Sequence, residues 1–158
     1  MKKRFLIIAV IAMSLALAWA VSAYFFQVAI VQGRSMEPSI RHLTPVLIDK
    51  RATDFCPGEI VAFHCEGLSA VLFKRVAGVP GDRILIKDGT LYRNGEPSTF
   101  YPEGAFTDAG ILGEETELAN DEYIVIGDNI AESKDSRDPD VGCVKENDMI
   151  GRLCYTFW

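Results

Sequence analysis

Residues 71–93 read VLFKRVAGVPGDRILIKDGTLYR, and this stretch decides the fold class. Its apolar runs are short, rich in β-branched and aromatic residues, and separated by Pro80-Gly81 and Asp88-Gly89. Such runs are typical of β-strands, and an Asp-Gly pair between two of them predicts a tight hairpin. We therefore expect three strands here, at Val71–Val79, Arg83–Lys87 and Thr90–Arg93.

The same pattern continues on both sides of this stretch. Pro57-Gly58 and Asn94-Gly95 predict further turns, and more strands are expected at Val46–Asp49, Ile60–Phe63, Tyr123–Ile126 and Met149–Phe157. The whole region therefore reads as one mainly β domain.

Glu96–Asn120 interrupts the pattern with prolines, glycines, acidic residues and interleaved aromatics. We expect it to be a long excursion from the sheet. A lid, a membrane-contacting flap and a loop that packs its own aromatics are all compatible with this composition, and the last is favoured.

An uncharged segment precedes the β region. The apolar run Phe5–Phe26 is about 33 Å long as a helix, which is enough to cross a hydrocarbon core of about 30 Å. Because Lys2, Lys3 and Arg4 come directly before it, the positive-inside rule predicts a cytoplasmic N-terminus. A cleavable secretory signal is the alternative, since Ala18-Trp19-Ala20 offers small residues at a suitable spacing. The length of the run favours an uncleaved anchor.

This organisation predicts a basic tip and membrane anchor in residues 1–27 and an extracytoplasmic domain in residues 28–158. The chain has 158 residues and a formal charge of −6, and its basic cluster lies before the anchor, so the domain itself is acidic. An acidic domain is a poor binder of nucleic acid, and we expect none as a partner.

The sequence offers few soft metal ligands. Its four cysteines form no Cys-x-x-Cys pair, and only His42 and His64 could join them, so no metal site is expected. Both histidines are interpreted as noncatalytic. On the export side disulfides can form, and the three possible pairings of Cys56, Cys65, Cys143 and Cys154 stay open. Alternatively the four cysteines are buried small apolar residues or form one disulfide.

Ser35 and Lys74 are the candidate catalytic pair. Ser35 lies in the segment Gly33–Ile40, shortly after the apolar run, and Lys74 lies within an expected strand. A serine hydroxyl becomes a good nucleophile when a neighbouring base takes its proton, and a lysine can be that base if its amine is neutral. Lowering a lysine pKa from about 10.4 to about 8 requires burial among apolar neighbours. A polar segment after another strand, Gly127–Gly142, would complete the site.

Four motifs in order carry a resemblance to a known family: Gly33–Ile40, Pro57–Phe63, Phe73–Asp82 and Gly127–Gly142. With the anchor, the chain resembles bacterial type I signal peptidases, the membrane-bound Ser-Lys leader peptidases, apart from roughly Glu96–Asn120. The resemblance implies a signal-peptidase/LexA-like β-sheet catalytic domain behind one N-terminal transmembrane helix. It also implies a cell-membrane enzyme that removes signal peptides from secretory preproteins without a cofactor.

The resemblance also implies residue roles. Ser35 would be the nucleophile and Lys74 the general base, while the backbone N–H of Ser35 would stabilise the oxyanion. Gly33 stands where some relatives carry a second donor, a serine hydroxyl. Supporting roles are implied for five more residues: Ser133 bonding the lysine amine, Arg75 pairing with Asp128, and Asp135 and Arg137 bracing the last motif.

Substrate contacts follow from the same resemblance. Small apolar pockets would favour Ala-x-Ala before the cut. An extended substrate could add as a strand beside Val71–Phe73 or beside the segment leading into Ser35. The residues expected to form these pockets are Val31, Met36, Ile40, Leu72 and Phe73.

Two other functions stay open at this point. The chain could be a dedicated processing peptidase for pilin-like or other specialised exported substrates, or an anchored binding protein of the same fold that cleaves nothing. A self-cleaving LexA-like repressor is excluded, because such proteins need a helical DNA-binding domain where this chain has an apolar segment. The oligomeric state is not predicted.

Overall fold

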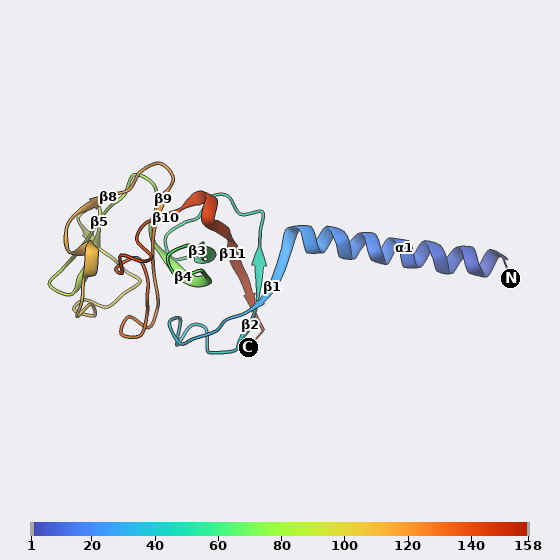
Figure 1. Ribbon diagram of the computed structural model, residues 1–158, viewed down its shortest axis with the longest axis horizontal. Helices are drawn as coiled ribbons and strands as arrows, with labels where there is room; N and C mark the ends of the chain where they lie inside the picture. The colour runs from blue at the N-terminus through green and yellow to red at the C-terminus, as the bar shows by residue number, and fades with distance from the viewer. Residues whose placement is uncertain (1, 158) are drawn as a thin grey trace.

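The computed structural model describes residues 2–157 as one long helix followed by a β domain (Figure 1). The elements in chain order are α1 (Lys2–Phe25), β1 (Phe26–Ile30), β2 (Pro45–Asp49), β3 (Ile60–Cys65), β4 (Ala70–Gly78), β5 (Arg83–Lys87), β6 (Thr90–Arg93), β7 (Glu96–Pro97), η1 (Gly110–Gly113), β8 (Thr116–Glu117), β9 (Glu122–Ile126), β10 (Val144–Lys145), η2 (Glu146–Asp148) and β11 (Met149–Thr156).

Helix α1 projects away from the β domain and packs against none of it along most of its length. Its side chains are apolar on every side, and a helix that is hydrophobic all round requires an apolar environment. The segment Lys3–Phe25 is long and apolar enough to cross a membrane. The segment expected to be the anchor therefore forms a helix of the length that a membrane span needs.

The β domain contains two antiparallel sheets. The larger has the order β1-β2-β11-β3-β4-β9-β10, and the smaller has the order β7-β6-β5-β8. The prediction of a mainly β domain is confirmed, and every expected strand is present with ends shifted by no more than two residues. Strand β1 was not predicted, because its residues continue the apolar run of the anchor.

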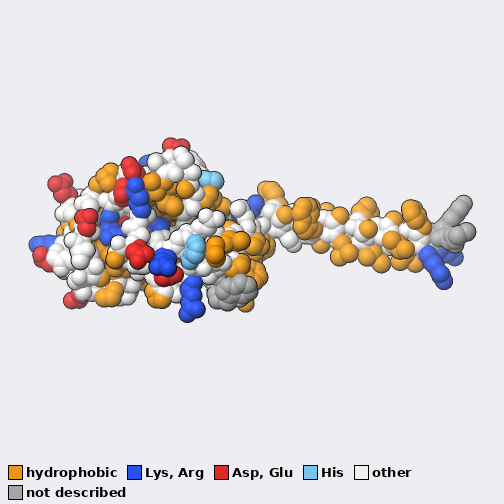
Figure 2. All heavy atoms as spheres, turned by 60° about the horizontal axis from the view of Figure 1, so that its bottom comes forward, with side chains coloured by type: hydrophobic (Ala, Val, Ile, Leu, Met, Phe, Trp, Pro, Cys, Tyr) orange, Lys and Arg blue, Asp and Glu red, His pale blue; other side chains and the backbone are white. Residues whose placement is uncertain are grey.

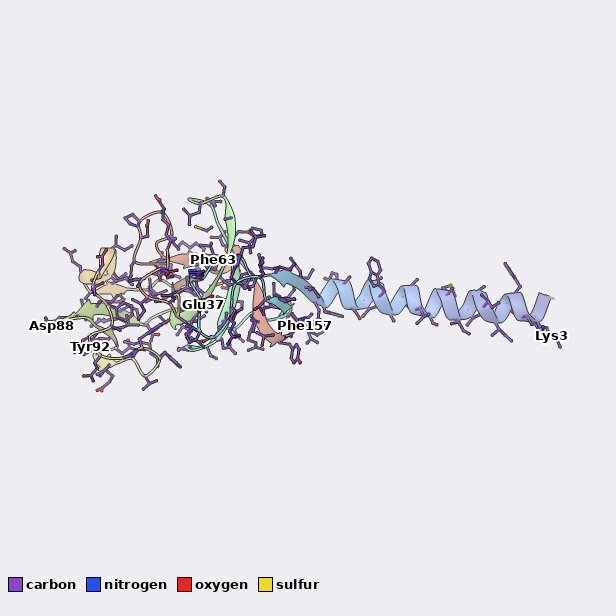
Figure 3. The ribbon with its side chains drawn as sticks, turned by 90° about the horizontal axis from the view of Figure 1, so that it is seen from below. Lys3, Glu37, Phe63, Asp88, Tyr92 and Phe157 are labelled. Carbon is purple, nitrogen blue, oxygen red and sulfur yellow. The ribbon has the colours of Figure 1, made fainter. Side chains whose placement is uncertain are left out.

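The two expected hairpin turns have the backbone that their sequences predict. Asp88 and Gly89 have φ values of 49° and 76°, and Asn94 and Gly95 have φ values of 55° and 83°. Paired positive φ values are the signature of the tight turns that match the twist of antiparallel strands. These turns lie in the smaller sheet, at the end of the domain far from α1, where Figure 3 labels Asp88 and Tyr92.

One core cluster holds the loop that carries Ser35. The loop joins β1 to β2, and backbone bonds from Val31 N to Thr44 O (3.0 Å) and from Leu43 N to Val31 O (2.8 Å) close its neck. Side chains at its two ends and in its middle enter the core between β2, β3 and β4. This cluster consists of Val31, Met36, Ile40, Val46, Ile48, Ala62 and Phe73. Burial of Met36 next to Ser35 therefore fixes the height of the serine above the sheet.

Candidate active site

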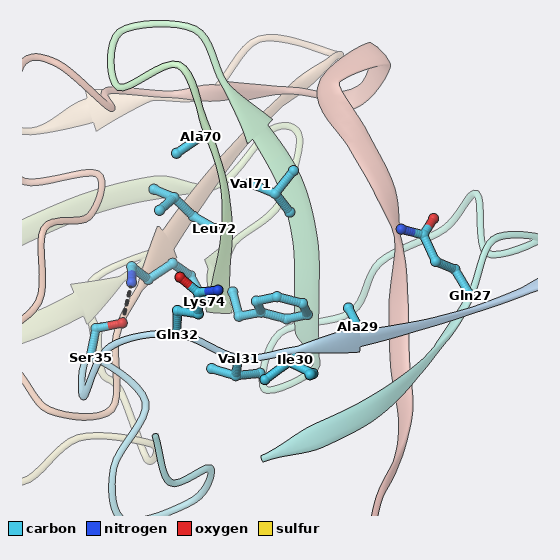
Figure 4. A pocket seen from close by; sticks show the side chains of 11 residues that line it. Gln27, Ala29, Ile30, Val31, Gln32, Ser35, Ala70, Val71, Leu72 and Lys74 are labelled. Atoms are coloured by element: carbon cyan, nitrogen blue, oxygen red, sulfur yellow. Dashed lines mark hydrogen bonds between the residues drawn. The ribbon is translucent and has the colours of Figure 1, made fainter. Parts of the chain in front are cut away.

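Ser35 and Lys74 meet beside β4, at the point where the pairing of β4 with β9 begins. Lys74 lies in β4, and its Nζ donates a hydrogen bond to Ser35 Oγ at 2.6 Å (Figure 4). Only 2% of Lys74 is exposed to solvent. The structure thus brings the two candidate catalytic residues into direct contact from segments 39 residues apart.

The environment of Lys74 favours its neutral form. Burial lowers the pKa of Lys74 from 10.5 to about 8, and the nearby carboxylates of Asp135 and Asp128 oppose this shift only in part. Successive strand residues point to opposite faces, so Arg75 does not share the pocket of Lys74. A lysine with this pKa has a substantial neutral fraction near pH 8 and can accept the Ser35 proton.

The turn after β9 holds the backbone of Ser35. The N–H of Asn129 donates to the carbonyl of Ser35 at 3.0 Å, and the Asn129 side-chain amide donates to the carbonyl of Arg34 at 3.2 Å. Gly127 allows this approach, because a Cβ there would collide with Ser35 O and with the Ser133 hydroxyl. The turn therefore sets the distance between the serine loop and the main sheet.

Gly127→Ala is expected to lower kcat/KM by about 10²-fold, because a displacement of about 1 Å at a reacting group can cost that much. The added methyl group would push Ser35 away from Lys74. The measurement is peptide cleavage under saturating and subsaturating conditions, with Gly113→Ala as the control, since a Cβ at Gly113 meets only Ala109 at 3.5 Å. Equal rates for the two variants would contradict this account of the turn.

Arg75 and Asp128 form a two-pronged ion pair. Arg75 Nε donates to Asp128 Oδ1 at 2.7 Å and Nη2 donates to Oδ2 at 2.6 Å, while Nη1 bonds the carbonyl of Gly58. The hydrogen bonds to Asp128 raise the pKa of Arg75 above its ordinary value. The side chains are only 20% and 10% exposed. This pair fastens the turn after β9 to β4, as the resemblance implied.

Asp135 and Arg137 fasten the same segment from its other end. Asp135 is fully buried and accepts a bond from the Gly127 N–H at 3.0 Å. Arg137 donates to Asp135 through Nε (2.8 Å) and Nη2 (3.0 Å), and also to the carbonyls of Ile130 and Ser133. Its guanidinium lies 5.5 Å from the ring centroid of Phe106, which comes from the excursion 96–120.

The excursion also contacts the site at a second point that the sequence did not reveal. The Tyr101 hydroxyl donates to the carbonyl of Ile126, the residue before Gly127, at 3.2 Å. Tyr101 and Phe106 stack edge to face at 5.4 Å. The excursion thus packs its own aromatics, as expected, and it also supports the segment that holds Ser35.

The position of Ser133 differs from the expectation. Its hydroxyl is buried and has no hydrogen-bond partner within residues 2–157, so the expected bond to the Lys74 amine is not formed. The hydroxyl lies close to Gly127 and to the Ser35 backbone instead. Ser133 therefore lies near the dyad, but the predicted bond to the Lys74 amine was wrong.

A groove of about 370 Å³ leads to the dyad between the chain from β1 and the first half of β4 (Figure 4). Its walls include three of the expected pocket residues, Val31, Leu72 and Phe73. Val71, expected to lie beside a substrate strand, also lines the groove. Residues not singled out in the sequence complete it: Gln27, Ala29, Ile30, Gln32 and Ala70. In the sequence, Gln27 and Gln32 interrupt an otherwise apolar run, and they were the signal that could have identified this wall of the groove.

Two expected pocket residues do not line this groove. Met36 and Ile40 are 1% and 2% exposed and belong to the core cluster under the serine loop. The prediction for them was wrong, because the loop turns their apolar side chains inward, where they anchor it.

Neither histidine contacts the dyad. His42 Nδ1 accepts a hydrogen bond from the Gly33 N–H at 2.9 Å across the neck of the serine loop, and His64 is exposed on β3. All four cysteines are present as free thiols.

Comparisons with known proteins agree with the fold. A family model described as "Signal peptidase, peptidase S26" matches residues 3–158. Signal peptidase I U of Bacillus subtilis is 29% identical, over 99% of this chain and 89% of that protein. Signal peptidase IB of Staphylococcus aureus is 30% identical, over 94% and 86% respectively. A signal peptidase I crystal structure from Enterococcus faecalis shares the fold, with a TM-score of 0.50 and 23% identity over 64% of this chain and 97% of that one. The chain belongs to the signal peptidase family, peptidase S26.

Proposed function

We propose that this chain is a membrane-anchored endopeptidase that removes signal peptides from exported preproteins, with Ser35 as the nucleophile and Lys74 as the general base. The observation that carries the proposal is the 2.6 Å hydrogen bond between Lys74 Nζ and Ser35 Oγ, made by a lysine that is almost completely buried. A buried amine beside a hydroxyl is the arrangement that a serine nucleophile needs for activation.

The reaction proceeds through an ester of Ser35. Neutral Lys74 takes the hydroxyl proton as Ser35 Oγ attacks the scissile carbonyl, and the resulting ammonium returns the proton to the leaving amine. The C–N bond breaks and the signal peptide stays bound to Ser35 as an acyl-enzyme. Lys74 then takes a proton from water, which attacks the ester, and returns that proton to Ser35 Oγ.

The oxyanion of each tetrahedral intermediate is stabilised by the backbone N–H of Ser35, which has no intrachain acceptor among residues 2–157. The Gly33 N–H is already engaged by His42 Nδ1. Gly33 therefore contributes the shape of the turn, through its φ of 98°, and not a second donor.

The substrate would lie in the groove as an added strand. Within the described residues, β4 pairs with β9 only from Arg75 onward, and β1 pairs with β2 on one side only. Residues 70–74 and β1 therefore present two unpaired backbone edges to the groove, and an extended peptide can bond to such edges. Val31, Leu72 and Phe73 would meet small side chains such as those of Ala-x-Ala.

Cleavage is expected to increase with pH up to about 8 and then to level off. The lowered pKa of about 8 means that Lys74 is mostly protonated, and thus inactive as a base, below that pH. The measurement is kcat/KM for a soluble peptide between pH 6 and pH 9. A rate that keeps rising toward the ordinary lysine pKa of about 10.4 would show that Lys74 is not desolvated during catalysis.

The outer face of the sheet supports the proposed location at a membrane surface. Strand register places Val28, Leu47 and Tyr155 in one row across β1, β2 and β11, and the Phe157 N–H donates to the carbonyl of Pro45 beside Ile30. The space-filling view shows apolar side chains gathered at the end of the domain nearest α1 (Figure 2), and Figure 3 places Phe157 there. In this arrangement α1 spans the membrane once, with a cytoplasmic N-terminus and an extracytoplasmic domain.

The test is cleavage of an Ala-x-Ala preprotein by the full-length chain in lipid vesicles, beside Ser35→Ala. Cleavage after the second alanine by the unaltered chain alone is expected. A pilin-like precursor is assayed in parallel, and cleavage of that precursor only would indicate a dedicated processing peptidase. No cleavage of either substrate by a folded protein would overturn the proposal and favour an anchored binding protein.

A further inference from the structure

The junction between α1 and the β domain contains no linker. Helix α1 ends at Phe25 and β1 begins at Phe26. The Lys50 N–H donates to the carbonyl of Phe25 at 2.9 Å, and Phe26 pairs with Asp49 in the sheet. The last residue of the helix is thus bonded to the segment that follows β2.

Arg51 adds a side-chain clamp to this junction. Its guanidinium carbon lies 5.5 Å from the ring centroid of Phe25 and 4.9 Å from that of Phe26, within range of a cation–π contact. Asp49 holds the guanidinium in place through two hydrogen bonds, of 2.9 and 2.8 Å. One arginine therefore contacts both the end of the helix and the start of the sheet.

The substrate groove begins at the same junction. Gln27 lines one end of the groove, and Ser35 and Lys74 line the other (Figure 4). The wall from Gln27 to Gln32 covers five steps of extended chain, or about 17 Å at about 3.3 Å per residue. A substrate strand that leaves the membrane beside α1 and runs along β1 would reach Ser35 after a similar number of residues.

We propose that the clamped junction, formed by Phe25, Phe26, Asp49, Lys50 and Arg51, fixes the number of residues that the enzyme accepts between the membrane-embedded part of a substrate and the cleaved bond. That number is about five extended residues, from the length of the groove wall. This inference rests on the proposed function. A flexible junction would let the domain tilt and accept many spacings, whereas a clamped one keeps Ser35 at one height above the bilayer.

The test uses the full-length chain in vesicles and a series of preproteins with the same apolar segment and the same Ala-x-Ala. Only the polar spacer between them varies, from none to about seven residues, so that about three to about ten residues separate the apolar segment from the cleaved bond, which brackets the groove length. Because Ala-x-Ala supplies three of the about five residues, the unaltered enzyme is expected to cleave best near a spacer of about two residues and at least tenfold less well with a spacer about three residues longer.

Inserting two glycines between Phe25 and Phe26 lengthens the junction by up to about 7 Å. We expect the best spacer to become about two residues longer, because Ser35 then lies farther from the bilayer. The matched control is the same insertion within the Asn94-Gly95 turn, at the far end of the domain, which should leave the best spacer unchanged.

Arg51→Ala should broaden the spacing preference and leave the best spacer unchanged. The ratio of the cleavage rate with the best spacer to the rate with neighbouring spacers should fall about threefold, because an exposed cation–π contact is lost. Arg83→Ala is the control. Arg83 is 59% exposed against 54% for Arg51 and also pairs with a carboxylate, but it lies in the smaller sheet.

Cleavage of a short soluble Ala-x-Ala peptide tests the proposed function separately from the fixed-spacing inference. All variants should cleave it as the unaltered chain does, because it needs no fixed height above a bilayer. If the unaltered chain cannot cleave the peptide or any preprotein, the proposed function fails. If it cleaves them but shows no preferred spacer, or if the junction insertion leaves the preferred spacer unchanged, the fixed-spacing inference is overturned.

Discussion

Lys74→Met is expected to lower cleavage by at least about 10⁴-fold, because residues of a nucleophile–base unit act together and loss of one removes most of the catalysis. Methionine has a similar length and fills the same buried space, but it cannot accept the Ser35 proton. The measurement is kcat/KM for a soluble peptide at pH 8. Lys87→Met, a change at an exposed position of β5, is the control and should retain full activity. Full activity in Lys74→Met would rule out Lys74 as the general base.

The same substitution is expected to stabilise the fold below pH 8. Burial lowers the pKa of Lys74 to about 8, so at lower pH the folded protein holds an ammonium that the unfolded chain would hydrate. A shift from 10.5 to about 8 corresponds to about 3 kcal/mol of unfolding free energy that the buried charge removes.

The sign of the pH dependence follows from proton binding. Between pH 8 and pH 10.5 the unfolded chain binds more protons at this position than the folded protein, so the original chain gains stability as pH rises. The advantage of Lys74→Met should therefore be largest at pH 7 and shrink toward pH 10. Urea unfolding in detergent at both values measures it. An advantage that did not change with pH would show that the lysine is hydrated in the folded state.

Asp128→Ala is expected to lower the free energy of unfolding by about 3 kcal/mol, since removing one partner of a largely buried ion pair leaves the other charge unpaired. It should also reduce kcat, because Asp128 fastens the turn whose next residue, Asn129, holds the carbonyl of Ser35. Denaturant unfolding and peptide cleavage of the same preparation measure both effects.

Two further variants test whether the loss of stability in Asp128→Ala comes from the buried, unpaired charge of Arg75. Glu117→Ala breaks the pair with Arg83, in which both side chains are more than half exposed, and should cost less than about 1 kcal/mol. Arg75→Met combined with Asp128→Ala should be more stable than Asp128→Ala alone, because no unpaired guanidinium remains. If the double variant is the less stable one, the unpaired charge is not the cause of the loss.

The sequence predicted the longer strands well because their boundaries carry local signals. Asp88-Gly89 and Asn94-Gly95 demand positive φ values wherever they occur in the chain, so the strands on either side could be placed without knowledge of the fold. Strand β1 lacks such signals. Phe26–Ile30 follows the anchor without a turn residue, and its strand conformation depends on β2, which lies beyond the whole serine loop.

The candidate site shows the same division between local and distant causes. Ser35, Lys74 and the Arg75–Asp128 pair followed from motifs. Met36 and Ile40 were misplaced because the direction of a side chain in an irregular loop depends on the core beneath it. The contact between Tyr101 and Ile126 also could not be predicted, because no local pattern relates an excursion to the strand end that it supports.

The two unpaired strand edges beside the groove leave this molecule open to self-association. Proteins ordinarily guard exposed edges with lysine, proline or a bulge, so that neighbouring copies do not add to the sheet. Residues 26–30 and 70–73 carry no charge and no proline. Such guards would also repel an incoming peptide backbone, so these edges have to stay open. The domain should therefore aggregate more readily when it is overproduced in solution than when α1 confines it to a bilayer, where neighbouring copies share one orientation.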